Sequence, residues 1–589
     1  MIAPARALLL GFLLALGAPG ARAASGPAVE AENGMVVSSQ RLASQAGADI
    51  LKAGGNAVDA AVAVAYAEAV VNPCCGNLGG GGFMVLHRAD GQSRFINFRE
   101  TAPGAASRDM YLDAAGSVVK GASLRGWKAA GVPGTVLGLN TALSEYGTLP
   151  LAQVMAPAIA LARDGFVLTR GDTDILDSGT ALFAGQANVA RIFLRPDGSP
   201  WRPGDRLVQA DLARTLRAIA ETGSDAFYKG AIPRQVEAAA RAGGGLLNAA
   251  DFAAYTVTES EPLTCRYRGV TILSAPPPSS GGTTLCEILG ILDGYDLRVA
   301  GFNSARTVHL MVEAMRRAYA DRNMLLGDPA FGTNPVAQLL SPAYAAQLRA
   351  SIRPDRATPS AEIRPDPGSL SAERPETTHI SVMDRDGNAV SLTYTINGYF
   401  GAGVIAGETG FFLNDEMDDF TVKPGVPNLF GLVQGSRNAI APGKRPLSSM
   451  APTLVLRDGR VAMVAGSPGG SRIITINAQT IINMLDFGME PQQAVDAPRI
   501  HHQWLPDTVY AEPFALSADT KAILRGMGHT LVEQTPWGAQ ELIAVRATAP
   551  ATPEAASSGN DASRTERMRP GLLYGANDNR RPAGAAVGE

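Results

Sequence analysis

The alternation of apolar and polar residues predicts three β-hairpins that share one turn signature. Each has two alternating strands joined around an Asp-Gly pair, which is a strong hairpin signal. The hairpins are expected at residues 83–99, 378–396 and 452–465, with turns at Asp90-Gly91, Asp386-Gly387 and Asp458-Gly459. Although they lie far apart in the sequence, such hairpins can join one antiparallel core.

Helical periodicity fills much of the sequence between these hairpins. An Ala-rich stretch at 38–71 is broken only at Gly54-Gly55, and further helices are expected at 148–164, 209–222, 304–321 and 473–487. Paired strands combined with long helical segments predict an α+β fold in which helices pack outside the sheets.

A glycine-rich run follows the first helical stretch, at residues 76–82. It lacks the Lys-Ser/Thr pair of a phosphate-binding P-loop, and a helix precedes it rather than follows it. We therefore expect a place where backbones pack closely, for which glycine is suited.

Composition narrows the possible functions. The chain has 589 residues, 46% of them apolar, and a formal net charge of −4, with no run of Lys and Arg. The length is ample for a large core, and the charge gives no support for nucleic-acid binding.

The N-terminus has the features of a secretory signal peptide at residues 1–23. Arg6 precedes an apolar run at 7–18, and the small-residue site Ala21-Arg22-Ala23 follows. The alternative is an uncleaved anchor, for which this run is short. We expect export to a bacterial periplasm or the medium, and no membrane span after removal of the signal.

The cysteines and histidines leave two questions open. Cys74, Cys75, Cys265 and Cys286 are even in number, so an exported chain could pair them, but buried free thiols are an equal alternative. No Cys/His metal spacing occurs, and the pair His501-His502 is expected to be structural. We expect neither a metal nor a cofactor.

Two segments have the composition of flexible peptide. Residues 547–567 are rich in Ala, Ser, Thr and Pro and are interpreted as a disordered insertion. The charged, Pro-rich segment 357–376 leads into a strand that starts abruptly at Thr377. This junction suggests that the chain is cut between Glu376 and Thr377.

Such a cut would give Thr377 both a hydroxyl nucleophile and a free α-amine. An α-amine has a pKa of about 7.7–8.0 and can serve as the base that activates the hydroxyl. Thr is also common in strands, so the pattern alone favours an ordinary first strand residue.

Motifs spread over nearly the whole mature chain resemble the gamma-glutamyltransferase family of N-terminal nucleophile hydrolases. They are NFRE at 97–100, RDMYL at 108–112, PPPSSGG at 276–282, TTHISV at 377–382, NDEMDDF at 414–420, RPLSSM at 445–450, GSPGGSR at 466–472 and LYGA at 573–576. Their number and order make the resemblance specific.

The resemblance implies a four-layer αββα sandwich and a proenzyme that cuts itself. The products would be a large subunit, 24–376, and a small subunit, 377–589, which remain together as a heterodimer. It also implies that Thr377 is the nucleophile, that Thr395 hydrogen-bonds it, and that the backbone N–H groups of Gly469-Gly470 form the oxyanion hole.

The resemblance also implies the groups that bind a glutamyl head. Its carboxylate binders match Arg99, Ser448 and Ser449, and its ammonium binders match Asn397, Glu416 and Asp419. A solvated acidic turn or a calcium loop is the alternative for these acids. Residues 424–435 resemble a lid over the pocket, in which Phe430 stands where lids of this kind carry Tyr.

The implied activity is that of a γ-glutamyltransferase and glutathione hydrolase. It would transfer the γ-glutamyl group of glutathione and related compounds to amino acids, peptides or water. One alternative is a cephalosporin (glutaryl) acylase of the same superfamily, and another is a non-catalytic periplasmic binding protein for γ-glutamyl peptides.

Overall fold

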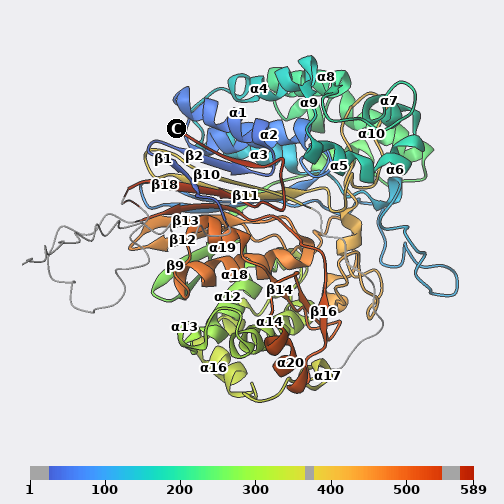
Figure 1. Ribbon diagram of the computed structural model, residues 1–589. Coiled ribbons are helices and arrows are strands. Elements are labelled where there is room, and N and C mark those ends of the chain that lie inside the picture. Colours follow the sequence, from blue (N-terminus) through green and yellow to red (C-terminus); the bar gives the residue numbers. More distant parts are fainter. Residues whose placement is uncertain (1–24, 365–376, 547–568, 570) are drawn as a thin grey trace, which may run out of the picture.

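Two β-sheets lie face to face in the middle of the molecule, with helices on both outer sides (Figure 1). This computed structural model describes residues 25–364, 377–546, 569 and 571–589. The result is the expected α+β arrangement of four layers, helix–sheet–sheet–helix.

The first sheet contains the strand that begins next to Thr377. Its seven strands pair antiparallel throughout. In spatial order they are β19 (Ala585–Gly588), β2 (Met35–Ser38), β10 (Thr378–Met383), β11 (Ala389–Thr395), β3 (Gly81–His87), β4 (Ser93–Phe98) and β7 (Thr258–Ser260).

The second sheet also has seven antiparallel strands. In spatial order they are β1 (Val29–Ala31), β18 (Leu573–Asn577), β17 (Glu541–Val545), β13 (Arg460–Gly466), β12 (Thr453–Arg457), β9 (Val270–Ser274) and β8 (Leu263–Tyr267). Two small sheets lie outside these, β5 (Phe166–Val167) with β6 (Arg206–Leu207), and β14 (Ile500–His501), β15 (Val509–Ala511) and β16 (Leu531–Glu533).

The helices form the two outer layers (Figure 1). Beside the first sheet lie α1 (Arg41–Lys52), α2 (Ala57–Val71), α3 (Thr135–Tyr146), α4 (Leu151–Asp164) and α8 (Ala210–Thr222), with the shorter α5 (Arg170–Ser178), α6 (Thr180–Ala184), α7 (Ala187–Phe193), α9 (Asp225–Tyr228), α10 (Ala231–Ala242) and α11 (Ala249–Ala254). Beside the second lie α12 (Gly281–Leu292), α14 (Ala305–Leu325), α18 (Ile473–Leu485) and α19 (Pro491–Asp496), with α13 (Leu297–Ala300), α15 (Val336–Leu339), α16 (Pro342–Ala350), α17 (Ser360–Ile363) and α20 (Ala518–Gly526).

Apolar side chains fill the space between the two sheets as well as the space under each helical layer. Phe83 and Val37 of the first sheet and Leu454, Val464 and Ile543 of the second belong to one buried cluster. The helix α2 is buried along its whole length, which explains why its sequence is apolar on all sides.

The predicted hairpins are confirmed, and the structure shows how they are shared between the sheets. β3–β4 and β10–β11 are neighbours in the first sheet, whereas β12–β13 belongs to the second sheet. The hairpins therefore build one core by stacking as well as by pairing.

The predicted helices are confirmed with small shifts at their ends. Ser304 lies outside α14 because its side chain accepts a hydrogen bond from Thr307 N and caps the helix. The break at Gly54-Gly55 separates α1 from α2, which begins with a capping box made by Asn56 and Asp59.

The glycine run 76–82 is a region of close backbone approach, as predicted. A Cβ atom on Gly80 would lie 1.9 Å from the carbonyl oxygen of Thr395, and one on Gly79 would lie 2.1 Å from that of Phe412. Only glycine allows these strands and loops to pack at such distances.

Three predicted features lie outside the described residues: the signal peptide at 1–23, Glu376 of the expected cleavage site, and the insertion at 547–567. Of the helices that the structure describes, none has the length and apolarity that crossing a membrane requires.

The side chain of His379 lies between the two sheets and provides a test of this packing. It is fully buried, its Nδ1 lies 2.8 Å from Thr393 Oγ1, and its Nε2 lies 3.1 Å from Ser381 Oγ. Burial lowers the pKa of His379 from its ordinary value of 6.5 to about 3.

Because the folded state keeps His379 neutral, stability is fully present above the unfolded pKa of 6.5 and is lost as the pH falls toward 3. At about pH 5 this group alone lowers the free energy of unfolding by about 2 kcal/mol, at about 1.4 kcal/mol per pKa unit. We expect His379→Gln to lose about 2 kcal/mol less than the wild type between about pH 7 and pH 5 in urea unfolding. Equal losses would show that His379 is not held neutral.

Candidate active site

Thr377 stands at the beginning of β10, next to the last residue of the neighbouring strand β11. Its Oγ1 donates to Thr395 Oγ1 at 3.4 Å, and both residues are buried. Alternation along β10 turns Thr377, like His379 and Ser381, toward the other sheet, whereas Thr378 faces α2. The structure thus places Thr377 and Thr395 in side-chain contact.

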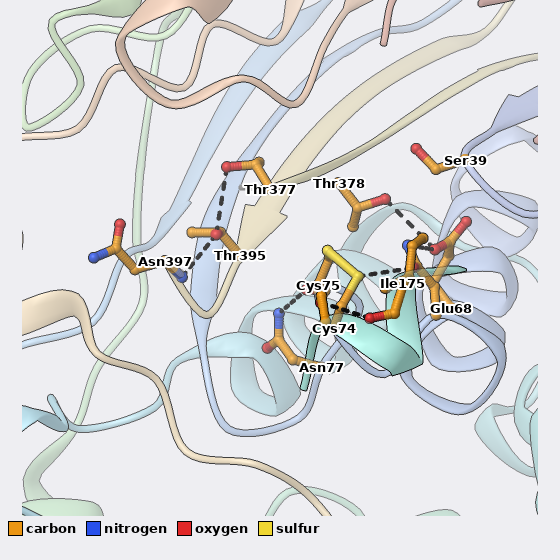
Figure 2. Close-up of a disulfide and its surroundings, with 12 residues drawn as sticks. Ser39, Glu68, Cys74, Cys75, Asn77, Ile175, Thr377, Thr378, Thr395 and Asn397 are labelled. Carbon is orange, nitrogen blue, oxygen red and sulfur yellow. Dashed lines mark hydrogen bonds between the residues drawn. A yellow bond between two sulfur atoms is a disulfide. The ribbon is translucent and has the colours of Figure 1, made fainter. Parts of the chain in front are cut away.

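Asn397 lies in the turn that follows β11, close to this pair of threonines (Figure 2). Its backbone N donates to Thr395 Oγ1 at 2.8 Å, and its Nδ2 donates to the carbonyl oxygen of Asp415 at 3.0 Å. Asn397 and Phe400 both have positive φ, 72° and 62°. Asn tolerates this left-handed conformation, but a bulky residue such as Phe400 does not, so the turn is strained at Phe400.

Arg99 is the centre of a buried ion-pair cluster. Its guanidinium lies 2.7 Å from Glu416, 2.5 Å from Asp419 and 3.4 Å from Glu100. One guanidinium thus faces three carboxyl groups, which favours the binding of an additional cation. The acids of residues 414–420 are buried rather than solvated, which excludes the interpretation as an exposed acidic turn.

Burial and mutual repulsion shift the pKa values in this cluster. Burial raises the pKa of Glu416 and Asp419 above their ordinary values, and that of Glu100 to about 7, although Arg99 acts in the opposite direction. Burial would lower the pKa of Arg99, but Glu416, Glu100 and Asp419 together raise it. Arg99 therefore remains charged, and the acids are poised to gain from a bound cation.

Ser448 and Ser449 lie beside this cluster, and an arginine that the sequence motifs did not reveal fixes one of them. Arg322 of α14 donates to Ser449 Oγ at 2.9 Å and to Gln434 Oε1 at 3.1 Å. It is buried, and desolvation lowers its pKa to about 10. The only sign of this role in the sequence is that Arg322 lies on a helix whose other residues are mostly buried.

Gly469 and Gly470 follow β13, and Gly470 lies against Phe430 of the segment 424–435. Both have positive φ, 147° and 55°. A Cβ atom on Gly470 would lie 2.4 Å from the ring of Phe430, so the ring covers this glycine. Gln503 Nε2 donates to the carbonyl oxygen of Phe430 at 3.0 Å and holds the segment in this position.

A small cavity brings most of the expected site residues together. It is lined by Arg99, Thr377, Thr395, Asn397, Asp419, Phe430, Ser448, Ser449, Met450, Gly470 and Ile473. Glu416 and Gly469 are not among these lining residues, and Glu416 acts on the cavity through Arg99. Residues from both halves of the sequence therefore meet at Thr377.

The cysteines are paired, which settles the alternative that the sequence left open. Cys74 is bonded to Cys75, and Cys265 is bonded to Cys286. Both histidines of the pair His501-His502 are buried, and His501 contacts Thr475 and Gln503.

Within the described part of the chain, one group of side chains is close enough to hold a metal ion: His309, Glu313 and His529. Glu313 already pairs with Arg316 and Arg317 at 3.4 Å and 2.6 Å, and these guanidiniums oppose a cation. The donor set therefore suits a structural cluster better than a metal site.

A two-sheet sandwich with a threonine at the head of a central strand defines the class of N-terminal nucleophile hydrolases. The profile of the family Gamma-glutamyltranspeptidase matches residues 43–585. The chain belongs to this family.

Similar proteins agree with this assignment. A glutathione hydrolase proenzyme of Pseudomonas sp. (strain A14) is 52% identical over 567 residues, 96% of each chain. The cephalosporin acylase of Bacillus halodurans superposes with a TM-score of 0.81 at 28% identity, covering 96% of this chain and 98% of that one. Helicobacter pylori gamma-glutamyltranspeptidase has a TM-score of 0.55 at 40% identity, covering 58% of this chain and 96% of the solved chain.

Proposed function

We propose that this protein is a self-processing γ-glutamyltransferase and glutathione hydrolase that uses Thr377 as its nucleophile. The observation that carries the proposal is the cavity in which Thr377 and Thr395 face Arg99 and Asp419. This cavity combines an activated hydroxyl with charged groups of both signs, as an amide substrate with a zwitterionic head requires.

In the proposed acylation step, the α-amine of Thr377 takes the proton of its own hydroxyl while Oγ1 attacks the γ-carbonyl carbon. The Gly469-Gly470 N–H groups stabilise the oxyanion. The amide C–N bond then breaks, the amine leaving group takes the proton, and a γ-glutamyl ester remains on Thr377. Water or the amine of an amino acid or peptide attacks this ester and restores the hydroxyl.

The same hydroxyl performs the maturation step. Its Oγ1 attacks the carbonyl carbon of Glu376, the C–N bond to Thr377 breaks, and the hydroxyl proton passes to the freed α-amine. Water then hydrolyses the resulting ester, which leaves Glu376 with a carboxylate, restores the Thr377 hydroxyl and divides the chain into residues 24–376 and 377–589. The coverage of the Helicobacter pylori enzyme supports this division, since a solved chain matched over 96% of its length spans 58% of this one.

The two fragments must stay together because each supplies part of the site and part of both sheets. Arg99 belongs to the first fragment and Thr377 to the second. In the first sheet, β2 and β3 of the first fragment flank β10 and β11 of the second. The two fragments would therefore form a heterodimer in which strands of one fragment lie between strands of the other.

Recognition of the glutamyl head uses the ion-pair cluster. Arg99, together with the hydroxyls of Ser448 and Ser449, binds the α-carboxylate, and Asn397, Asp419 and Glu416 receive the α-ammonium. Arg99 already pairs with the acids, so the site has charges of both signs. A zwitterionic glutamyl head can therefore bind there without changing the net charge of the site. The substrates are glutathione and other γ-glutamyl compounds, met in the periplasm or the medium after export.

A cephalosporin acylase is the second candidate, and the likeness to the Bacillus halodurans enzyme is the observation that favours it. A glutaryl side chain has no α-ammonium, so it makes no use of the buried acids around Arg99. The cluster therefore supports the γ-glutamyl donor.

A denaturing gel and two substrates test the proposal. We expect two fragments, of which the smaller begins at Thr377, and release of p-nitroaniline from γ-glutamyl-p-nitroanilide in preference to glutaryl-p-nitroanilide. Preference for the glutaryl compound would favour the acylase. A single persistent chain without turnover would favour a binding protein.

A further inference from the structure

The disulfide between the adjacent residues Cys74 and Cys75 lies directly behind the candidate active site (Figure 2). Both cysteines are 1% exposed. They form the turn between α2 and the glycine run that leads into β3. Neither cysteine lines the cavity, so a role in the reaction has to pass through their neighbours.

One set of contacts connects this turn to the residue that follows the nucleophile. Asn72 Oδ1 lies 3.1 Å from Cys74 Sγ, and Asn72 Nδ2 donates to Glu68 Oε2 at 2.7 Å. Glu68 in turn accepts from Thr378 Oγ1 at 3.5 Å. The start of β10 thus rests on the same turn as the disulfide.

A second set of contacts connects the turn to the end of β11. Asn77 Nδ2 donates to the carbonyl oxygen of Cys75 at 3.0 Å, and Asn77 Oδ1 accepts from Gly80 N at 2.9 Å. Gly80 lies against the carbonyl oxygen of Thr395, and the adjacent Gly81 pairs with Thr395 in the sheet. A shift of Asn77 is therefore transmitted to Thr395.

The most direct contact is with the strained turn after β11. The backbone N of Phe400 donates to the carbonyl oxygen of Cys74 at 3.1 Å. Phe400 has a positive φ of 62°, and for a bulky residue such a conformation persists only when the surroundings hold it. A covalent ring that includes the Cys74–Cys75 peptide bond leaves little backbone freedom at the acceptor of this hydrogen bond.

We propose that the Cys74–Cys75 disulfide is a positioning device for the reaction, which holds the 395–400 turn so that Thr395 and Asn397 face Thr377. The inference deepens the proposed function, because it relies on Thr395 and Asn397 acting on the nucleophile and the substrate. Its specific consequence is a loss of turnover per active site, rather than a loss of stability alone.

The test compares two double variants of the mature enzyme. C74S/C75S removes the bridge behind the site, and C265S/C286S removes the bridge between β8 and α12, which lies away from the cavity. Active sites are counted by stoichiometric acylation, and kcat and KM are measured with γ-glutamyl-p-nitroanilide. We expect C74S/C75S to lose about 10-fold in kcat per active site, within the roughly 10²-fold that a misplacement of 1 Å can cost. C265S/C286S should lower Tm and keep its kcat.

Asn77→Ala provides an independent variant, because it breaks the link to Gly80 and leaves the bridge intact. It should reduce kcat in the same way, and its combination with C74S/C75S should reduce kcat little further, as expected for residues that act through one path. If C74S/C75S does not mature, Asn77→Ala decides the question.

Three results would overturn the inference: wild-type kcat in Asn77→Ala, equal losses in the two double variants, or free thiols at Cys74 and Cys75 in active wild-type enzyme. The proposed function has a separate test, since its failure would appear as a wild type that does not turn over.

Discussion

Replacement of Thr377 by alanine will leave the protein as one chain and remove its activity. The substitution deletes the only atom that can attack both the Glu376 carbonyl and the donor amide in the proposed mechanism. Removal of a catalytic nucleophile typically costs about 10⁴-fold to 10⁶-fold in turnover. A denaturing gel and the release of p-nitroaniline from γ-glutamyl-p-nitroanilide measure the two effects.

Thr377→Ser is the matched control, because it keeps the hydroxyl and the α-amine. Without the γ-methyl group, the hydroxyl samples more rotamers, so we expect slower cleavage and reduced turnover rather than none. Cleavage of Thr377→Ala at the same bond would show that another group performs the maturation.

Asp419→Asn will remove the preference of the site for substrates whose glutamyl head carries an ammonium group. Asp419 lines the cavity and pairs with Arg99 at 2.5 Å, so the amide preserves the shape and removes one buried charge. In a complex, loss of one partner of a buried charge pair, here Asp419 with the substrate ammonium, costs about 2–5 kcal/mol, which corresponds to roughly 30-fold to several thousand-fold. We expect a loss of this size in kcat/KM for γ-glutamyl-p-nitroanilide.

The selectivity of the loss is the decisive feature. Turnover of glutaryl-p-nitroanilide, which lacks the ammonium, should not fall, so the ratio of the two kcat/KM values changes. Asp386→Asn, at the exposed tip of the same β10–β11 hairpin, should leave both values unchanged. Equal losses with both substrates in Asp419→Asn would show that Asp419 supports the fold and does not recognise the head.

Local patterns predicted most of the scaffold that surrounds Thr377. Asp-Gly turns between alternating strands located β3–β4, β10–β11 and β12–β13, because a short turn and a period of two are local properties. Which sheet each hairpin joins depends on contacts between residues hundreds of positions apart, such as β2 with β10, and no local signal encodes them.

The sequence likewise predicted only part of the candidate site. The resemblance identified Arg99, Asn397 and Asp419, and the structure brings them into one cavity with Thr377. It did not reveal that Arg99 pairs directly with Glu416 and Asp419, since that depends on contacts between segments far apart in the sequence.

Arg322 and the Cys74–Cys75 turn were missed for a related reason. Arg322 reaches Ser449 and Gln434 from a buried helix, and the Cys74–Cys75 turn accepts hydrogen bonds from Asn77 and Phe400. Their importance arises from what they hold in place, which a motif in a single sequence does not show.

The acyl-enzyme is the most direct test of the account. The mature protein is mixed with a γ-glutamyl donor, quenched in acid within the first turnover, and examined by peptide mass spectrometry. We predict that the N-terminal peptide of the smaller fragment, beginning at Thr377, is heavier by one γ-glutamyl group, and that no other peptide is. A γ-glutamyl group on a different residue, or turnover without any labelled peptide, would contradict the assignment of Thr377 as the nucleophile.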